Sequence, residues 1–484
     1  MESKPTPIQV ALSFYQEKKF TEALGILEQS SAKIADPVNF YKLKGLCLSE
    51  INEHDEAVKC FVEAVKLAPL DPMPYTNIGN SLAKNLQFEE ADKYFDLALT
   101  VEPGYAEAFV GKGVAAFQRL DYSSAEKAFE QALAIRPGHL TVETNLGNCY
   151  SVQGKYDPAL ELLDRSIAQD PENGLARTNR GLIHLVKGNF NQGWEDYEYR
   201  FDSGNMMPNR FQQIPRWPGP NSPSSNVLIW AEQGLGDEIM FSTIFPDLAK
   251  LPHTLYIECD PRLFEIFRTS FPGLHFVKKR TITGVDGIDY QLPLASLGLY
   301  FRRDASDFPR ATGGHLARPT GLMSPTTEQF LRSLPRPWTG VSWESYALTK
   351  NFRGRKSILA SEFSGLTEKI PGSVINLQFP NPHRHEGLTE QLIPNRVITV
   401  PGIDLKNDVG PMAELMSQLD EVITIGNSVA HMCGAFGIPA RVLLPNVPDW
   451  RWGCDGVASN WYSSLRLHRN SSATEWSTLL ASIK

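Results

Sequence analysis

The fold of the first half of this chain is decided by a unit of 34 residues, clearest at residues 72–105, PMPYTNIGNSLAKNLQFEEADKYFDLALTVEPGY. A glycine, an alanine, a phenylalanine and a proline recur at matching places in neighbouring units. Four positions that share one period indicate an array of stacked structural repeats. These positions are Gly45, Gly79, Gly113, Gly147 and Gly181; Ala57, Ala91, Ala125 and Ala159; Phe61, Phe95 and Phe129; and Pro69, Pro103, Pro137 and Pro171.

Each unit is expected to be a pair of antiparallel helices. The glycines and alanines are small enough for two helices to approach closely, the phenylalanines fill the groove between hairpins, and each proline ends a second helix. The last unit departs from the pattern, because Gly193 takes the alanine position and several aromatic residues follow it. We expect those aromatics, Trp194, Tyr197, Tyr199 and Phe201, to pack onto the next domain; a ligand groove is the alternative.

This pattern resembles the tetratricopeptide repeat. The resemblance covers about residues 4–203 and implies an α-solenoid of about six repeats, residues 1–203. Asn77, Asn145 and Asn179 recur two residues before the repeat glycine. On a concave face such side chains can hold a peptide backbone by paired hydrogen bonds, so they are candidates for an acceptor groove. A solvated helix face explains them equally well.

Composition excludes several classes of protein. The 484 residues are 42% hydrophobic and 21% charged, which is typical of a globular chain. A net charge of −8 argues against a general nucleic-acid binder; it divides into −9 for residues 1–200 and +1 for the rest. The six cysteines form no C-x-x-C pair, which fits a reducing compartment. Without a long apolar run or a signal-peptide pattern, we expect no transmembrane segment and a cytoplasmic location.

The second half of the chain has a different period. Residues 204–225 are rich in Gly, Pro, Asn and Ser and are expected to form a linker. Short apolar runs then alternate with helical stretches, which predicts buried parallel strands in an α/β fold. The runs are Val227–Trp230, Leu255–Glu258, His275–Val277, Tyr290–Pro293, Gly340–Trp343, Val374–Gln378, Val397–Val400, Val422–Ile425 and Arg441–Leu444.

A proline-rich break at residues 333–337 divides this half into two Rossmann-like units, residues 226–332 and 333–484. Two such units that face each other across a cleft are a site for a nucleotide ligand. Candidate residues follow three of the expected strands. After the first strand, Gly234 and Gly236 permit a tight turn, and Asp237 lies at a helix start, where a simple capping role is the alternative.

The other two groups belong to the C-terminal unit. Gly426 begins a loop in which Asn427 or Ser428 can cap a helix whose N–H groups would face a diphosphate. His431 lies one turn into that helix, where a core histidine is the alternative. Four cations in residues 350–356, including Lys350, Arg355 and Lys356, could neutralise a phosphate or form a solvated loop. No metal-ligand spacing is present, so we expect neither a metal nor a cofactor.

Four segments together resemble the bacterial tetratricopeptide-repeat glycosyltransferases, whose catalytic half is similar to the ADP-heptose:lipopolysaccharide heptosyltransferases of glycosyltransferase family nine. They are WAEQGLGDEIMF (230–241), RGRKSI (353–358), SVAHMCGAFGIP (428–439) and LLPNVPDWRW (443–452). The resemblance implies a GT-B fold, with the acceptor on the N-terminal unit, the nucleotide-sugar donor on the C-terminal unit, and metal-independent inverting transfer.

Carried over by position, Asp237 matches the general base and Lys356 matches a lysine that contacts the donor phosphates. Asn427 and Ser428 fall in the diphosphate loop. The heptosyltransferases usually carry an aspartate, which contacts sugar hydroxyls, where this chain has Gly426. The segment Asp449–Trp452 is expected to shape the cleft.

The sequence therefore predicts a glycosyltransferase that takes a nucleotide-sugar as substrate and acts on a protein or peptide captured by the repeats. A saccharide acceptor and a non-catalytic repeat scaffold are the alternatives. A nicotinamide-dinucleotide enzyme is disfavoured, because no G-x-G-x-x-G follows a strand.

Overall fold

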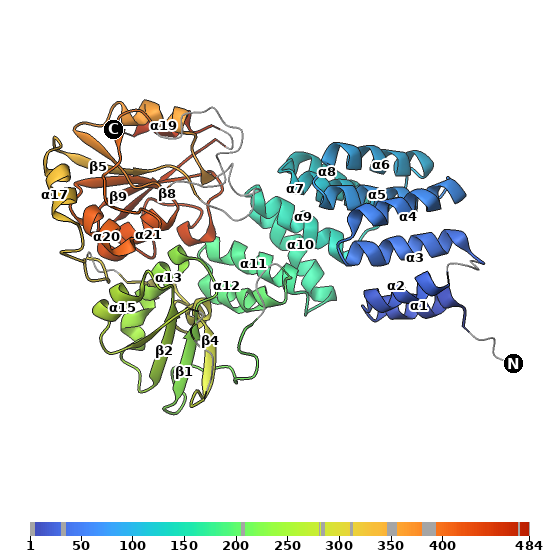
Figure 1. Cartoon of the computed structure of the whole chain (residues 1–484), viewed down its shortest axis with the longest axis horizontal. Helices are drawn as coiled ribbons and strands as arrows, with labels where there is room; N and C mark the ends of the chain where they lie inside the picture. The colour runs from blue at the N-terminus through green and yellow to red at the C-terminus, as the bar shows by residue number, and fades with distance from the viewer. Residues whose placement is uncertain are drawn as a thin grey trace. The chain divides into compact units, whose positions relative to one another are not determined.

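The structure is a computed structural model that describes residues 5–30, 35–204, 209–279, 281, 286–309, 313–345, 356–379, 394–472 and 475–483. The chain divides into two compact units, Met1–Pro171 and Glu172–Lys484. Helices make up the first unit, and the second contains two sheets with helices on their faces (Figure 1).

The described part of the first unit consists of antiparallel helical hairpins. Their helices, in pairs, are α1 (Pro7–Gln16) and α2 (Phe20–Gln29), α3 (Pro37–Glu50) and α4 (His54–Leu67), α5 (Pro72–Lys84) and α6 (Phe88–Val101), α7 (Ala106–Gln118) and α8 (Tyr122–Ile135), and α9 (Leu140–Val152) and α10 (Tyr156–Gln169). From α4 onward, the second helix of each pair ends two residues before a repeat proline, as the sequence predicts.

Contact between a glycine and a phenylalanine ring brings the two helices together in three successive hairpins. A Cβ atom on Gly79 would lie 2.6 Å from the Phe95 ring, so only glycine lets α5 and α6 approach this closely. Phe95 and Ala91 on α6 are fully buried. The same contact recurs between glycine and phenylalanine in the hairpins before and after this one. These contacts confirm the role that the period assigns to the glycines and phenylalanines.

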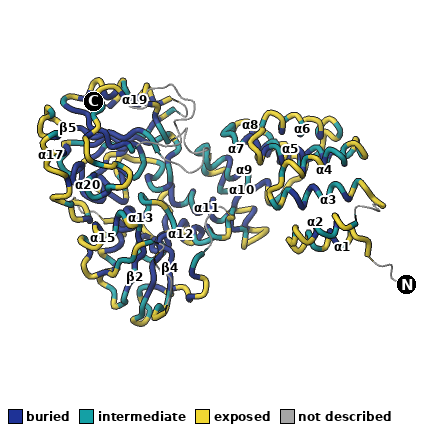
Figure 2. The backbone as a smooth tube through the Cα atoms, viewed as in Figure 1, coloured by how far each residue is buried: buried dark blue, intermediate teal, exposed yellow. Residues whose placement is uncertain are grey.

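The second unit begins with the last helical hairpin, α11 (Gly174–Val186) and α12 (Phe190–Tyr197), followed by the 3-10 turn η1 (Glu198–Phe201). Its first sheet has the order β3-β2-β1-β4, and its second the order β10-β9-β8-β5-β6-β7. The described strand pairs of both sheets are parallel. Strands of both sheets lie in the buried interior (Figure 2).

The strands are β1 (Asn226–Trp230), β2 (Thr254–Cys259), β3 (His275–Lys278), β4 (Tyr290–Pro293), β5 (Trp338–Ser342), β6 (Ser373–Asn376), β7 (Val397–Ile398), β8 (Glu421–Ile425), β9 (Ala440–Leu444) and β10 (Leu465–Arg469). Every predicted run overlaps one of them, which confirms a parallel α/β region; β10 was not predicted. The helices are α13 (Leu235–Phe241), α14 (Phe245–Leu248), α15 (Phe264–Ser270), α16 (Gly298–Phe301), α17 (Pro325–Arg332), α19 (Ala360–Thr367), α20 (Val409–Ser417), α21 (Ser428–Phe436) and α22 (Ser477–Ser482).

The described residues of the expected linker pack on the first sheet. The Trp217 amide donates to the carbonyl of Gln291 on β4, and the Gln291 amide donates to Pro215, both at 2.9 Å. Phe211, Ile214 and Trp217 are buried. From residue 209 on, this segment therefore covers the edge of the sheet, rather than forming an extended tether.

Aromatic residues of the last repeat pack against the α/β region, as the sequence predicts. Trp194 is fully buried, and its indole Nε1 donates to the Arg302 carbonyl at 2.7 Å. Its ring lies 2.5 Å from the place of a Cβ on Gly298, and 5.4 Å, centroid to centroid, from Trp450. The sixth repeat is therefore part of the core of the second unit.

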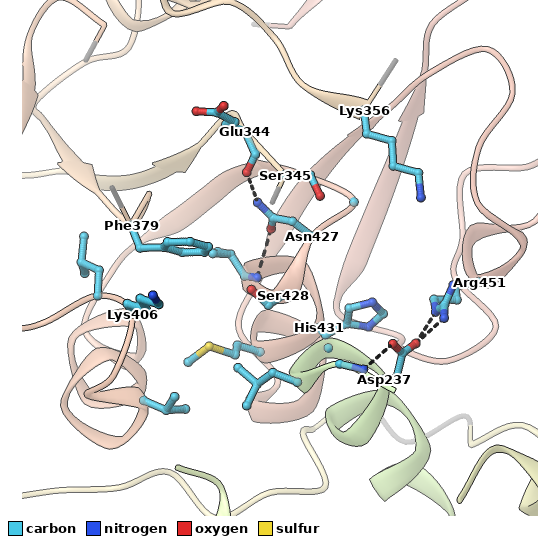
Figure 3. A pocket seen from close by; sticks show the side chains of 18 of the residues that line it. Asp237, Glu344, Ser345, Lys356, Phe379, Lys406, Asn427, Ser428, His431 and Arg451 are labelled. Atoms are coloured by element: carbon cyan, nitrogen blue, oxygen red, sulfur yellow. Dashed lines mark hydrogen bonds and ion pairs between the residues drawn. The ribbon is translucent and has the colours of Figure 1, made fainter. Parts of the chain in front are cut away.

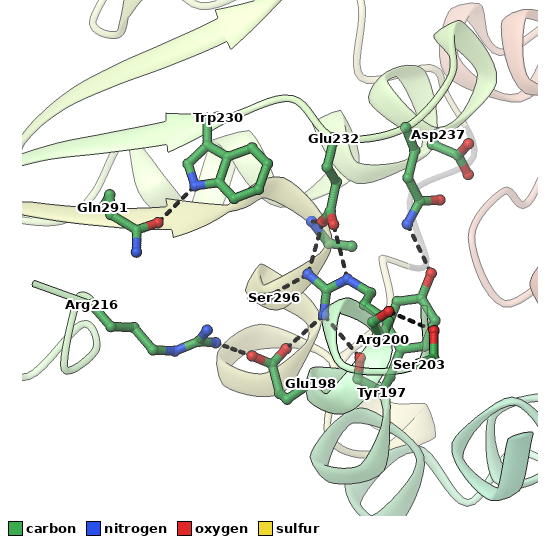
Figure 4. A network of polar contacts seen from close by, with 12 residues as sticks. Tyr197, Glu198, Arg200, Ser203, Arg216, Trp230, Glu232, Asp237, Gln291 and Ser296 are labelled. Carbon is green, nitrogen blue, oxygen red and sulfur yellow. Dashed lines mark hydrogen bonds and ion pairs between the residues drawn. The ribbon is translucent and has the colours of Figure 1, made fainter. Parts of the chain in front are cut away.

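A buried ion pair fastens the same repeat to the turn that follows β1 (Figure 4). The Arg200 guanidinium is fully buried and donates to both carboxylate oxygens of Glu232, at 2.8 and 2.9 Å. It also donates to Ser296 Oγ at 2.9 Å. Glu232 in turn accepts the Ala295 amide at 2.9 Å. Paired hydrogen bonds of this kind fix both partners in one geometry.

Candidate functional site

A cavity of about 440 Å³ opens at the carboxyl ends of strands in both sheets of the second unit. Its walls come from the turn after β1, the loop after β8, the start of α21 and the segment 449–452 that follows β9. In parallel α/β proteins, ligands bind at this end of the strands. Many of the residues that the sequence selects lie in this cavity; the described ones are Gly234, Gly236, Asp237, Lys356, Gly426, Asn427, Ser428 and His431.

Asp237 is the third residue of α13, and Gly234 is its N-cap. One carboxylate oxygen, Oδ2, accepts the Gly234 amide at 3.3 Å, which is the capping role that the sequence left open. The other oxygen, Oδ1, accepts Arg451 Nε at 2.5 Å (Figure 3). Asp237 therefore both closes the turn and meets a cation at the cavity wall.

Arg451 joins two carboxylates. Its Nη1 donates to Asp449 Oδ1 at 2.6 Å, and the second oxygen of Asp449 pairs with Lys356 Nζ at 2.9 Å. Burial alone would raise the pKa of Asp449, but Arg451 and Lys356 together hold it well below its usual range. The result is a chain of alternating charges, Asp237, Arg451, Asp449 and Lys356, along one wall. Arg451 also donates to Gln233 Oε1 at 2.9 Å.

The first turn of α21 forms another part of the cavity wall. Asn427 is the N-cap, and its Oδ1 accepts the Val429 amide at 3.0 Å. Its Nδ2 donates to Ser342 Oγ at 2.8 Å and to the Glu344 carbonyl at 3.2 Å, which fixes the loop against β5. The N-terminal N–H groups of a helix carry partial positive charge and attract anions. Asn427, rather than Ser428, is thus the cap, and Ser428 opens the helix beside the cavity.

His431 is both buried and part of the cavity wall. Only 5% of it is exposed, and burial, followed by the nearby Arg451, lowers its pKa to about 3, so the ring is neutral near pH 7. Its Nδ1 lies 3.1 Å from the Tyr462 hydroxyl, and its ring stacks on Trp452 at 4.9 Å. A Cβ on Gly236 would lie 3.0 Å from the His431 ring, so that glycine lets α13 and α21 approach each other.

An aromatic ring packs against Gly426. A Cβ at this position would lie 2.6 Å from Trp452 Nε1 and 3.1 Å from its Cε2. The indole therefore fills the space that the side chain of any larger residue at position 426 would take. At position 426, where the resemblance leads one to expect an aspartate, Trp452 of the segment Asp449–Trp452 thus lies in the place of the side chain.

Lys350 and Arg355 lie outside the described residues. Other cavity residues had no signal in the sequence, because they come from loops of no distinctive spacing. Arg262 and Lys406 are examples: the Arg262 guanidinium donates to the Lys406 carbonyl at 2.9 Å and so connects the two α/β halves at the cavity. The segment Asp449–Trp452 was expected to shape the cleft, but its sequence did not predict the ion pairs that Arg451 and Asp449 form there.

The three repeat asparagines lie on first helices of their hairpins. Asn77 on α5 and Asn145 on α9 are half-buried in the first unit. Asn179 on α11 belongs to the second unit and is only 9% exposed, and its Nδ2 has no hydrogen-bond partner among the described residues. The structure thus gives Asn179 a different environment from the other two.

Among the residues that the structure describes, no three His, Cys, Asp or Glu side chains gather as metal ligands. No helix in those ranges has the length and apolar character needed to cross a membrane.

Comparison with known proteins identifies the first unit. Profiles described as tetratricopeptide repeat match residues 38–69, 76–139 and 116–178. The N-terminal part of the chain is therefore an array of tetratricopeptide repeats, which indicates a protein partner.

A curated relative, protein FlbA of Caulobacter vibrioides, is 30% identical over 305 residues. The match covers 57% of this chain and 48% of FlbA, so the chain spans about half the length of that relative.

Among solved structures, the chain is similar to the Cut9–Hcn1 hetero-tetramer of APC/C, with 20% identity, a TM-score of 0.38, and coverage of 42% of this chain and 40% of that one. It is also similar to YrrB, titled a TPR protein with an unusual peptide-binding site (23% identity, TM-score 0.29, 38% of this chain and 91% of that one). The N-terminal part of the chain thus consists of tetratricopeptide repeats, and a parallel α/β region with a cavity at its strand ends follows it.

Proposed function

We propose that this protein is a glycosyltransferase of GT-B type, which moves a sugar from a nucleotide-sugar to an acceptor hydroxyl. One observation carries the proposal: Asp237, Lys356 and the Asn427-capped start of α21 line a single cavity at the carboxyl ends of the parallel strands. A carboxylate, a cation and a helix N-terminus are the groups that this reaction requires.

In the proposed step, the acceptor hydroxyl lies against Asp237 and its oxygen attacks the anomeric carbon of the donor sugar. The bond between that carbon and the β-phosphate oxygen breaks, and the hydroxyl proton passes to the Asp237 carboxylate. The nucleoside diphosphate leaves with the electron pair. Attack from the face opposite the leaving group inverts the anomeric centre.

Arg451 has a positioning role in this mechanism. It holds Asp237 Oδ1 at 2.5 Å, which leaves Oδ2, bonded to the Gly234 amide at the longer distance of 3.3 Å, for the acceptor hydroxyl. Negative charge that develops on the diphosphate is stabilised by Lys356 and by the first-turn N–H groups of α21.

We propose a protein or peptide as the acceptor, captured by the repeats; Asn77 and Asn145, half-buried on first helices, are candidate contacts. Support comes from the tetratricopeptide array, since modules of this kind bind proteins. A saccharide acceptor would leave the array without a role in the reaction.

The first test is Asp237→Asn. The variant keeps the size of the side chain but removes the base, so transfer should fall by about 100-fold or more, while donor binding and melting temperature stay nearly unchanged. Asp420→Asn is the matched control, because Asp420 also pairs with an arginine, Arg336, at 2.9 Å but lies outside the cavity lining. Equal activity in wild type and Asp237→Asn would remove the general-base assignment.

A second test removes metal ions. If Lys356 and the α21 N-terminus neutralise the diphosphate, transfer should continue unchanged in excess EDTA. Loss of activity in EDTA that magnesium restores would contradict the metal-independent mechanism.

A non-catalytic scaffold is the second candidate, and the pairing of Asp237 with Arg451 favours it, because a carboxylate in an ion pair can also have a purely structural role. Thermal stabilisation against UDP, GDP, ADP, CMP and their sugar conjugates separates the two functions. Ligand at 100 times its dissociation constant stabilises a fold by about 2.7 kcal/mol. No shift at millimolar concentration would favour the scaffold.

A further inference from the structure

Trp452 combines burial with an unused hydrogen-bond donor. It is 4% exposed, yet its indole Nε1 has no hydrogen-bond partner among the described residues. It is also one of the residues that line the cavity. Buried N–H groups in proteins are almost always bonded, so an unpaired one on a residue that lines a cavity suggests an acceptor supplied by a ligand.

The surroundings of Trp452 fix where this donor lies. Nε1 is the atom nearest to the place of a Cβ on Gly426, at 2.6 Å, and Gly426 directly precedes the N-cap of α21. The indole ring is held by stacking on His431 at 4.9 Å, with an angle of 28° between the planes. Stacking on His431 and the close approach of Gly426 keep the N–H group in place beside the first turn of α21.

In the described part of the wall, the two carboxylates near Trp452 are engaged by cations. Asp237 is paired with Arg451, and Asp449 is paired with both Arg451 and Lys356. Gly426 contributes no side chain that could accept the indole proton. The group that fits beside Trp452 Nε1 is therefore a ligand oxygen with a free lone pair. The adjacent N-terminus of α21 favours an oxygen that carries negative charge.

We propose that the Trp452 indole N–H donates a hydrogen bond to an oxygen atom of the nucleotide-sugar, on either its diphosphate or its sugar. Trp452 is then a donor-binding residue, and Gly426 is the residue whose lack of a side chain leaves room for the indole. This inference rests on the proposed function, because it takes the cavity to be the nucleotide-sugar site.

Indole signals in a nitrogen–proton NMR spectrum test this directly. The chain has nine tryptophans, and the missing signal in Trp452→Phe assigns the one from Trp452. The wild-type chain is titrated with UDP, GDP, ADP and CMP, then with their sugar conjugates. The Trp452 signal should move on saturation with the nucleotide family that binds. Movement with the diphosphate alone identifies a phosphate oxygen, and movement with only the conjugate identifies a sugar oxygen.

Affinity gives a second readout. Trp452→Phe keeps an aromatic ring against His431 but lacks the N–H, so the dissociation constant of the nucleotide that binds should rise about tenfold. Trp217→Phe is the matched control: Trp217 is also fully buried with an unpartnered Nε1, but it lies outside the cavity lining, so its affinity should match wild type.

If Trp452→Phe does not fold, Gly426→Ala replaces it. The added methyl would lie 2.6 Å from Nε1, too close for the ring to keep its place, so it should shift the Trp452 signal in the free protein, which assigns it, and weaken binding by displacing the N–H.

The outcomes distinguish the two proposals. A nucleotide that binds without moving the Trp452 signal, and with equal affinity for Trp452→Phe, overturns this inference and leaves the transferase proposal in place. Failure of every nucleotide to bind at millimolar concentration overturns both.

Discussion

At the scale of single residues, Glu238, the neighbour of Asp237 on α13, contributes to the pH dependence of stability. Its side chain is 2% exposed, and burial raises its pKa to about 7, although the Asp260 amide donates to it at 2.6 Å. In the unfolded chain, the ordinary value is 4.5. The folded chain thus binds this proton more tightly, and the stability that it contributes below pH 4.5 is lost as pH rises through 7.

We expect Glu238→Gln to remove this dependence. The melting temperature of the variant, relative to wild type, should be higher at pH 8 than at pH 5, with an effect on the free energy of unfolding of at most about 3 kcal/mol. Glu265→Gln is the control: Glu265 is 70% exposed, so its effect should be equal at both pH values. An equal difference for Glu238→Gln at pH 5 and 8 would contradict the assignment.

Candidate residues that the sequence places just after a strand lie together in the cavity. Asp237, Asn427 and His431 each lie a few residues beyond a buried run, and parallel strands bring their carboxyl ends to one edge. Contact between Trp452 and Gly426 could not be predicted this way. It joins residues from different loops, and only tertiary packing determines which ring lies over which glycine.

At the scale of elements, the repeat hairpins depend on a close approach between α5 and α6. Gly79→Ala places a methyl group 2.6 Å from the Phe95 ring, so we expect a loss of about 1–3 kcal/mol in the free energy of unfolding. Gly25→Ala on α2 meets no atom within 4 Å and should gain about 0.5–1 kcal/mol from helix propensity. Urea unfolding of both variants measures this. A Gly79→Ala chain as stable as Gly25→Ala would show that the glycine is not required.

The element that sequence reasoning missed, β10, shows the limit of a search for apolar runs. Its sequence, LRLHR, alternates, with Leu465 and Leu467 buried and Arg466 exposed. Alternation of this kind is typical of a strand at the edge of a sheet, and β10 is the first strand in the order of its sheet. The central strands are covered on both faces, and this is why they stand out as continuous apolar runs.

At the scale of the whole molecule, the sixth repeat belongs to the α/β unit. The 34-residue period predicts the end of the array near residue 203, but the compact units divide at Pro171. Periodicity reports which residues form a hairpin, and it does not report what the hairpin packs against. Trp194 and Arg200 show the difference, since the one is buried against Gly298 and the other is paired with Glu232.

We therefore expect a chain that starts at Glu172 to fold and unfold cooperatively, while a chain that starts at Gly204 does not. The shorter chain lacks Arg200 and leaves Glu232, which is 3% exposed, without its cation. Loss of one partner of a buried ion pair costs about 3–5 kcal/mol. Circular dichroism during heating compares the two chains, and equal melting curves would contradict the expectation.

A point variant tests the same pair in the full chain. Arg200→Ala should lower the free energy of unfolding of the second unit by about 3–5 kcal/mol. Arg303→Ala, which removes a half-exposed arginine paired with Glu195, should change it by less than about 1 kcal/mol. Equal effects of the two variants would show that Arg200 contributes no more than a surface charge.

The division at Pro171 has a consequence for building hybrid proteins. Hairpins that precede it could be exchanged for, or extended by, other arrays of the same 34-residue length, provided that Glu172 and everything after it stay native. Such a graft would change which partner is recruited without touching the Arg200–Glu232 pair or the turn that carries Asp237. A graft made at residue 203 would replace the sixth repeat, and the chain would lose Trp194 and Arg200 with it.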